Sequence, residues 1–151
     1  MASPGPDGGL PRGYILAFDF GLRRIGVAVG QSTTRTASAL RTVANGREPD
    51  WAALDRLITE WRPGLLLVGL PLGPEGDETP MSHAARAFGA ALGDRYALAV
   101  DYADERLTSR DAGRRFAELR AAGGARRKNA DQLDAISAQI ILENWLQSAH
   151  A

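Results

Sequence analysis

The stretch that decides the fold is residues 13–31, GYILAFDFGLRRIGVAVGQ. Its two apolar runs, at residues 14–20 and 24–31, are typical of β-strands and meet at a short turn. A parallel crossover needs a dozen residues or more, so strands this close form an antiparallel hairpin. Polar and apolar residues alternate at 35–43, which predicts a third strand. The chain therefore opens with a three-stranded antiparallel meander.

Helical and strand patterns alternate through the rest of the chain. Helical spacing of apolar residues predicts helices at 49–64, 79–96, 108–124 and 130–149, and apolar runs predict strands at 65–71 and 97–105. The order βββαβαβαα predicts an α/β fold. Its mixed five-stranded sheet has three antiparallel strands, then two crossover strands, with helices on both faces.

Composition narrows the class of protein. The 151 residues suit one domain, and 44% hydrophobic with 24% charged residues indicates a globular chain. The absence of cysteine excludes disulfides, thiolate metal sites and a cysteine nucleophile. Residues 1–13 are rich in Gly and Pro and predict a disordered tail, followed by a single domain at 14–148. No apolar run suggests a membrane helix or a signal peptide, so we expect a cytoplasmic protein.

Acidic residues fall where two of the predicted strands end. Asp19 interrupts the first apolar run, where an uncompensated charge is costly. Glu105 follows the last predicted strand. Ligands of open α/β sheets bind at the carboxyl ends of the strands, so these two carboxylates are expected to converge. Taken alone, Asp19 could instead cap a turn, and Glu105 could pair with Arg106 or Arg110.

A third carboxylate is expected from the last helix. At about 100° per residue, Asp134 shares a face with Ala138, Ile141 and Trp145, and Asp131 falls about 60° away. Either acid could point inward, or Asp134 could be a partly exposed helix charge. Three converging carboxylates favour a site for hard divalent cations such as Mg²⁺ or Mn²⁺, which prefer oxygen ligands. Two such ions are the usual arrangement in phosphodiester cleavage.

Four motifs together resemble one known family. They are FDFGLRRIGVAVGQ at 18–31, LLLVGLPLGPEGDETP at 65–80, DERLTS at 104–109 and LDAISAQIILENWL at 133–146. In this order they are similar to the YqgF family, also called RuvX or RuvC-like Holliday junction resolvases. The resemblance implies an RNase H-like fold and a bacterial cytoplasmic nuclease that processes the 5′ end of pre-16S rRNA. The older proposal for the family is resolution of Holliday junctions.

The resemblance also assigns site residues. The Asp of the family's first-strand motif matches Asp19, the Glu of its D-E-R motif matches Glu105, and the Asp of its last helix matches Asp134. These three would be the catalytic residues and the metal ligands, with Asp131 remaining the alternative third acid.

Basic residues near these motifs suggest contacts with nucleic acid. Arg106 could bind a phosphate or hold Glu105 in place. The segment with Arg126, Arg127 and Lys128 could contact the nucleic-acid backbone or be a solvated loop.

Other functions remain open from the sequence. A non-catalytic RNA-binding ribosome-assembly factor is compatible with the formal net charge of zero. An actin-like ATPase shares the D-x-G element but needs a second domain. The partner would be structured RNA, including a ribosomal precursor particle, or branched DNA, because both present the same phosphates. The sequence does not set the oligomeric state.

Overall fold

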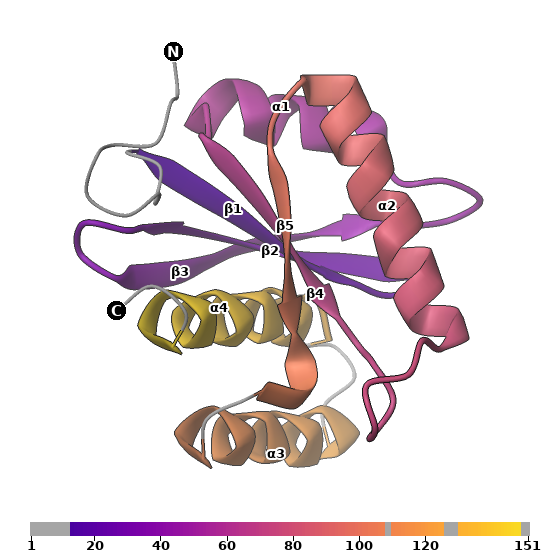
Figure 1. Cartoon of the computed structure of the whole chain (residues 1–151), viewed down its shortest axis with the longest axis vertical. Helices are drawn as coiled ribbons and strands as arrows, with labels where there is room; N and C mark the ends of the chain where they lie inside the picture. Colours follow the sequence, from indigo (N-terminus) through magenta and orange to yellow (C-terminus); the bar gives the residue numbers. More distant parts are fainter. Residues whose placement is uncertain (1–12, 108–109, 126–129, 149–151) are drawn as a thin grey trace.

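A computed structural model describes residues 13–107, 110–125 and 130–148, and its core is one five-stranded sheet. The strands are β1 (Tyr14–Phe20), β2 (Arg24–Gln31), β3 (Thr36–Ala44), β4 (Leu65–Leu70) and β5 (Val100–Asp104). Their order is β3-β2-β1-β4-β5, so β1 lies at the centre (Figure 1). The pairs β1–β2 and β2–β3 are antiparallel, whereas β1–β4 and β4–β5 are parallel. The predicted meander and the two crossover strands are confirmed.

Helices cover both faces of the sheet, as predicted. They are α1 (Trp51–Trp61), α2 (Pro80–Tyr96), α3 (Arg110–Ala125) and α4 (Ala130–Ser148), with a 3-10 turn, η1 (Glu105–Leu107), after β5. Helices α1 and α2 lie on one face, α4 lies on the other, and α3 packs on the outer side of α4 (Figure 1). The predicted tail at 1–13 falls almost entirely outside the described residues.

Local signals set where the helices begin and end. The Asp50 carboxylate accepts a hydrogen bond from the Ala53 N–H at 3.2 Å, and Thr79 forms a reciprocal capping box with Ser82. Ala97 caps the end of α2 in the left-handed conformation, with φ of 53°. The strand expected from residue 97 therefore begins only at Val100. The helix cap uses residues that the apolar pattern had assigned to the strand.

Alternation along β1 sends its side chains into two separate cores. Leu16 and Phe18 pack in a cluster with residues of α1 and α2. Ile15 and Ala17 pack on the opposite face with residues of α4. Successive side chains of a strand point to opposite faces, so Asp19 follows Ala17 onto the α4 face.

Small residues of β2 let α4 lie directly on the sheet. On this face β2 presents Gly26, Ala28 and Gly30. A Cβ atom at Gly26 would collide with the backbone carbonyl of Asp134, and one at Gly30 would lie 2.8 Å from Cδ2 of Leu142. Glycine permits this close backbone approach. The close approach of α4 to β2 therefore depends on the missing side chains at Gly26 and Gly30.

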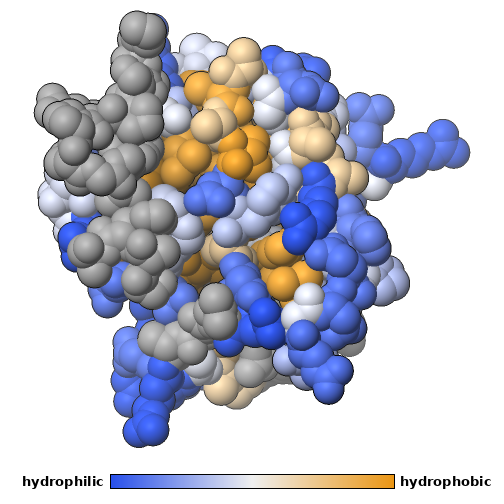
Figure 2. Space-filling model, in the orientation of Figure 1, coloured by the Kyte–Doolittle hydropathy of each residue, from blue (hydrophilic) through white to orange (hydrophobic). Residues whose placement is uncertain are grey.

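Hydrophilic residues cover most of the coloured surface in the view of Figure 2, and hydrophobic residues gather in a patch in its upper middle and in a smaller one below. Among the described residues, Leu22 in the β1–β2 turn is the large hydrophobic side chain that is exposed, at 69%. No helix in the described part of the chain is long and apolar enough to span a bilayer.

Candidate active site

The carboxylate of Asp19 lies between two glycines of the neighbouring strands. Asp19 pairs with Gly26 of β2. On the other side, β1 and β4 are in register as far as Phe18 and Val68, so Gly69 is the next neighbour. Gly26 admits the backbone of α4, and a Cβ at Gly69 would lie 3.0 Å from Oε2 of Glu105. The two missing side chains thus leave Asp19 room beside α4 and Glu105.

Glu105 joins this edge of the sheet because β5 ends immediately before it. It is the first residue of η1, and its side chain lies over Gly69 on the α4 face. Burial and, to a smaller extent, the nearby charges of Asp19 and Asp104 together raise the pKa of Glu105 to about 7. Burial also raises the pKa of Asp19 to about 6, with a second contribution from Asp134. The expected convergence of Asp19 and Glu105 is confirmed.

Asp134 completes the acidic group from α4. The buried face that it was predicted to share is present, since Ala138, Ile141 and Trp145 are all buried. Its own carboxylate is held by Arg24, whose Nε donates to Oδ2 at 2.6 Å. Asp131 lies in the first turn of α4, but its side chain is outside what the structure describes. Asp134 as the third acid, with Asp131 as the alternative, therefore stays a prediction.

The acids can offer oxygen ligands to a cation, although in this conformation their described side chains do not surround a single ion. Within the described residues, no hydrogen bond is donated to the Asp19 carboxylate, and its charge faces two further carboxylates. Half-buried, mutually repelling oxygens of this kind suit a hard divalent cation. No three acidic or histidine side chains of the described residues are yet arranged to hold one ion. The ion pair of Asp134 with Arg24 is consistent with that result.

The guanidinium group of Arg106 pairs with Asp104. Its Nη2 donates to Oδ2 of Asp104 at 2.6 Å, and its Nε donates to Oδ1 at 3.1 Å. Its Nη1 also reaches the carbonyl oxygen of Pro74 at 3.4 Å. Of the two alternatives for Arg106, holding Glu105 is not what the structure shows, because the guanidinium turns toward Asp104 and the loop after β4. Contact of Arg106 with a phosphate stays a prediction. This pairing lowers the pKa of Asp104.

The basic segment with Arg126, Arg127 and Lys128 lies outside the described residues, so its placement near the acids stays a prediction.

Asn45 is a supporting residue that the sequence analysis missed. It is only 7% exposed, and its Nδ2 donates to the carbonyl oxygen of Gly21 at 2.7 Å. Its backbone N–H donates to the carbonyl oxygen of Arg23 at 2.9 Å. Asn45 therefore ties the loop after β3 to the turn that follows Asp19. A single Asn after a strand carries no distinguishing sequence signal, because its partners are far away in the chain.

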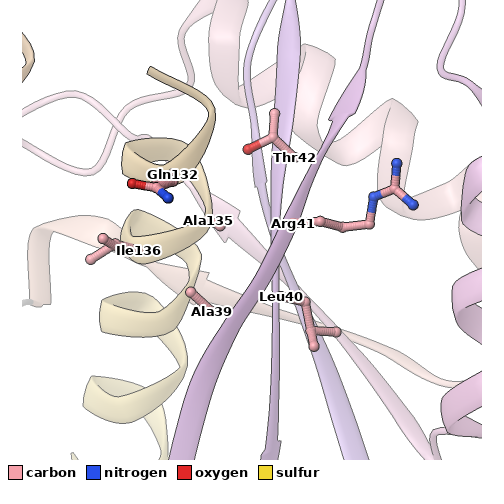
Figure 3. Close-up of a pocket in the computed structure, with 7 residues that line it drawn as sticks. All are labelled: Ala39, Leu40, Arg41, Thr42, Gln132, Ala135 and Ile136. Carbon is pink, nitrogen blue, oxygen red and sulfur yellow. The ribbon is translucent and has the colours of Figure 1, made fainter. Parts of the chain in front are cut away.

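A groove whose lining includes none of the three acids lies between β3 and α4. It has a volume of about 470 Å³ and is lined by Ala39, Leu40, Arg41, Thr42, Gln132, Ala135 and Ile136. Figure 3 shows that Leu40 and Arg41 point away from α4, so small and apolar side chains form most of its walls. Thr42 pairs with Gly26, which places the groove two strands from Asp19. Its described lining residues bring no charged groups together, which makes the acidic edge the better candidate for chemistry.

Comparisons with known proteins agree with the fold. The family model described as RuvX, Holliday junction resolvase, matches residues 13–148. A protein of Xanthomonas euvesicatoria named "Putative pre-16S rRNA nuclease" is 48% identical over 139 residues, covering 90% of this chain and 88% of that protein. A Xylella fastidiosa protein of the same name is 48% identical over 146 residues, covering 96% and 91%. In fold, the chain is similar to Thermus thermophilus RuvC in complex with a Holliday junction substrate. That likeness has a TM-score of 0.51 and 16% identity, and covers 91% of this chain and 96% of RuvC.

Proposed function

The chain belongs to the RuvX family, and we propose that it is a divalent-metal-dependent nuclease that processes the 5′ end of pre-16S rRNA. The observation that carries this proposal is the meeting of Asp19 and Glu105, from two strand ends, with Asp134 of α4 nearby. Buried carboxylates that raise one another's pKa cost stability, and clustered groups of this kind are typical of functional sites. The name shared by the 48% identical relatives supports the substrate.

Three carboxylates would hold Mg²⁺ or Mn²⁺ in this site. Asp19 would contribute from the centre of the sheet, with Glu105 on one side and Asp134 on the other. Bound in a pair, such ions activate a water molecule and stabilise the leaving oxygen of a phosphodiester. With a pKa of about 7, Glu105 is partly protonated at neutral pH and must lose that proton to become a ligand.

Basic residues around the acids would hold the nucleic-acid backbone. Arg106 lies immediately after Glu105, and the guanidinium group that Asp104 holds would face a phosphate from the rim of the site. The predicted contacts of Arg126, Arg127 and Lys128 would add salt-dependent affinity without sequence preference. Structured RNA in a ribosomal precursor, within the cytoplasm, is the partner we propose.

Branched DNA is the second candidate substrate, because the matching family is described as a Holliday junction resolvase. The chemistry at phosphorus would be the same, so the acids do not distinguish RNA from DNA. A third possibility, an RNA-binding assembly factor without catalysis, would have little use for buried carboxylates that repel one another.

A cleavage assay on two substrates tests the proposal. The purified chain and Asp19→Asn are incubated with an RNA carrying the precursor 5′ end and with a four-way DNA junction, in Mn²⁺ and in chelator. We expect Mn²⁺-dependent cleavage of the RNA by the wild type alone. Cleavage of only the junction would assign the protein to branched DNA. Binding of the RNA without cleavage of either substrate would support the assembly factor and reject the nuclease.

A further inference from the structure

We propose that Arg24 is the counter-ion of Asp134 in the metal-free site. When the site binds a divalent cation, this ion pair breaks and the Asp134 carboxylate becomes available to the cation. Arg24 would then be a positioning residue that sets the cation affinity of the site. The inference rests on the proposed function, because it assumes that Asp134 becomes a metal ligand. Its basis is the ion pair of Arg24 with Asp134, at 2.6 Å, beside two further acids.

The backbones of both partners are fixed, so that only their side chains are able to rearrange. The carbonyl oxygen of Arg24 accepts a hydrogen bond from the N–H of Gly21 at 2.9 Å, and Asn45 ties the same turn to the loop after β3. Asp134 lies at the point where the backbone of α4 touches Gly26. The exchange we propose therefore needs no movement of a strand or a helix.

The ion pair is accessible enough to be exchanged. The side chains of Arg24 and Asp134 are 44% and 30% exposed. Ion pairs at this level of exposure add little to stability, because water and salt screen them. In its ion pair with Asp134, Arg24 contributes one positive charge. A divalent cation carries two charges and would satisfy Asp19 and Glu105 as well.

Arg24 also has a purpose before the cation binds. The charge of Asp134 contributes to the raised pKa of Asp19, so an unbalanced third carboxylate would make the metal-free site still less stable. Arg24 offsets one of the three negative charges in that state. The same offset must weaken cation binding, because the cation has to compete with the guanidinium for Asp134.

Calorimetric titration of the full chain with Mn²⁺ tests this competition. Arg24→Gln should bind Mn²⁺ about 3- to 10-fold more tightly than the wild type, which corresponds to the strength of a partly exposed ion pair. Arg23→Gln is the matched control, since it removes one positive charge from the same turn. It should change the affinity by less than about 2-fold, a screened surface effect. Arg24→Lys retains the charge and should bind Mn²⁺ nearly as the wild type does.

Thermal unfolding gives a second readout that is independent of activity. The rise in Tm on adding Mn²⁺ should be larger for Arg24→Gln than for Arg23→Gln, because tighter binding stabilises the folded state more. Equal Mn²⁺ affinities for the two variants, or weaker binding by Arg24→Gln, would overturn the role of Arg24 and leave the proposed function intact. Failure of the wild type to bind Mn²⁺ would overturn both.

Discussion

The two faces of the sheet belong to the same strands but are packed with different kinds of side chain. On the α1–α2 face, Phe18 meets Phe88 edge to face, with ring centroids 5.6 Å apart, and Phe88 also contacts Phe20 and Trp51. On the α4 face, the next residue along β1 is Asp19, and its neighbours are Gly26 and Gly69. Large rings fill the first face, whereas missing side chains and carboxylates characterise the second.

This contrast suggests that the α1–α2 face stabilises the fold and the α4 face supplies the chemistry. Burial of aromatic rings stabilises the fold by about 3–5 kcal/mol per ring relative to alanine. The acidic edge lowers the stability of the fold, because burial and mutual repulsion disfavour the charged carboxylates. They raise the pKa of both Asp19 and Glu105. A destabilising cluster is retained when its chemistry is useful. Substitutions on the two faces should therefore separate stability from activity.

The largest effect should come from Glu105→Gln. Removing one ligand charge should reduce cleavage by about 10³-fold, or about 4 kcal/mol in the barrier, with little loss of stability. Asp104→Asn is the matched control, because Asp104 precedes Glu105 in the chain but pairs with Arg106. It should lower the rate by less than about 10-fold. Equal losses from both substitutions, measured as single-turnover rates, would contradict the separate roles of these neighbours.

Phe88→Ala should show the reverse pattern on the other face. Phe88 is 4% exposed and contacts three aromatic rings, so truncation should lower the free energy of unfolding by about 3–4 kcal/mol. Urea denaturation measures the loss. At low temperature, where the variant is still folded, its cleavage rate should stay within about 3-fold of the wild type. A large loss of activity in the folded variant would show that the two faces are coupled.

Gly26→Ala should damage both properties. The added methyl group would collide with the carbonyl of Asp134, so α4 has to move away from the sheet. Overpacking of this kind costs about 1–3 kcal/mol, and here it also displaces a proposed metal ligand. Ala28→Gly, on the same strand and face, is a useful comparison because it creates no collision. Retention of wild-type stability and Mn²⁺ affinity by Gly26→Ala would refute the close packing of α4.

The smallest effect is a pH-dependent gain in stability for Asp19→Asn. The folded pKa of Asp19 is raised from 3.8 to about 6, so the wild type loses stability as the pH rises through that interval. Asparagine cannot ionise. In chelator at pH 8 the variant should therefore be more stable by about 2 kcal/mol, and the difference should vanish toward pH 4. Urea midpoints across this range measure it, and a variant less stable at pH 8 would contradict the repulsion.

Local patterns were sufficient to predict most of the fold. Two apolar runs joined by a short turn and the alternation at 35–43 predicted the meander, and the caps at Asp50 and Thr79 marked where helices begin. Strand ends also located Asp19 and Glu105 at one edge, since parallel strands β1, β4 and β5 end on the same side. The start of β5 was predicted too early, because the helix cap at Ala97 depends on a backbone conformation that hydrophobicity does not encode.

Local sequence patterns could not predict contacts between residues that are far apart in the chain. The ion pair between Arg24 and Asp134 joins residues 110 positions apart, and the buried hydrogen bonds of Asn45 depend on how two loops meet. The importance of Gly26 emerges only from the register of β1 and β2 and the height of α4 above them. The third acid was hardest to choose for the same reason, because a helical face alone leaves Asp131 and Asp134 close together.

The central claim is that Asp19, Glu105 and Asp134 together hold the divalent cation that supports phosphodiester cleavage. A crystal structure grown with Mn²⁺ tests it most directly, because the anomalous scattering of manganese locates the ion without assumptions about the chemistry. We predict a peak with carboxylate oxygens of Asp19 and Glu105 at about 2.0–2.2 Å, the distances usual for small divalent ions, and with Asp134 released from Arg24. A peak away from Asp19, or Asp134 still bound to Arg24 beside an ion held by other residues, would contradict the claim.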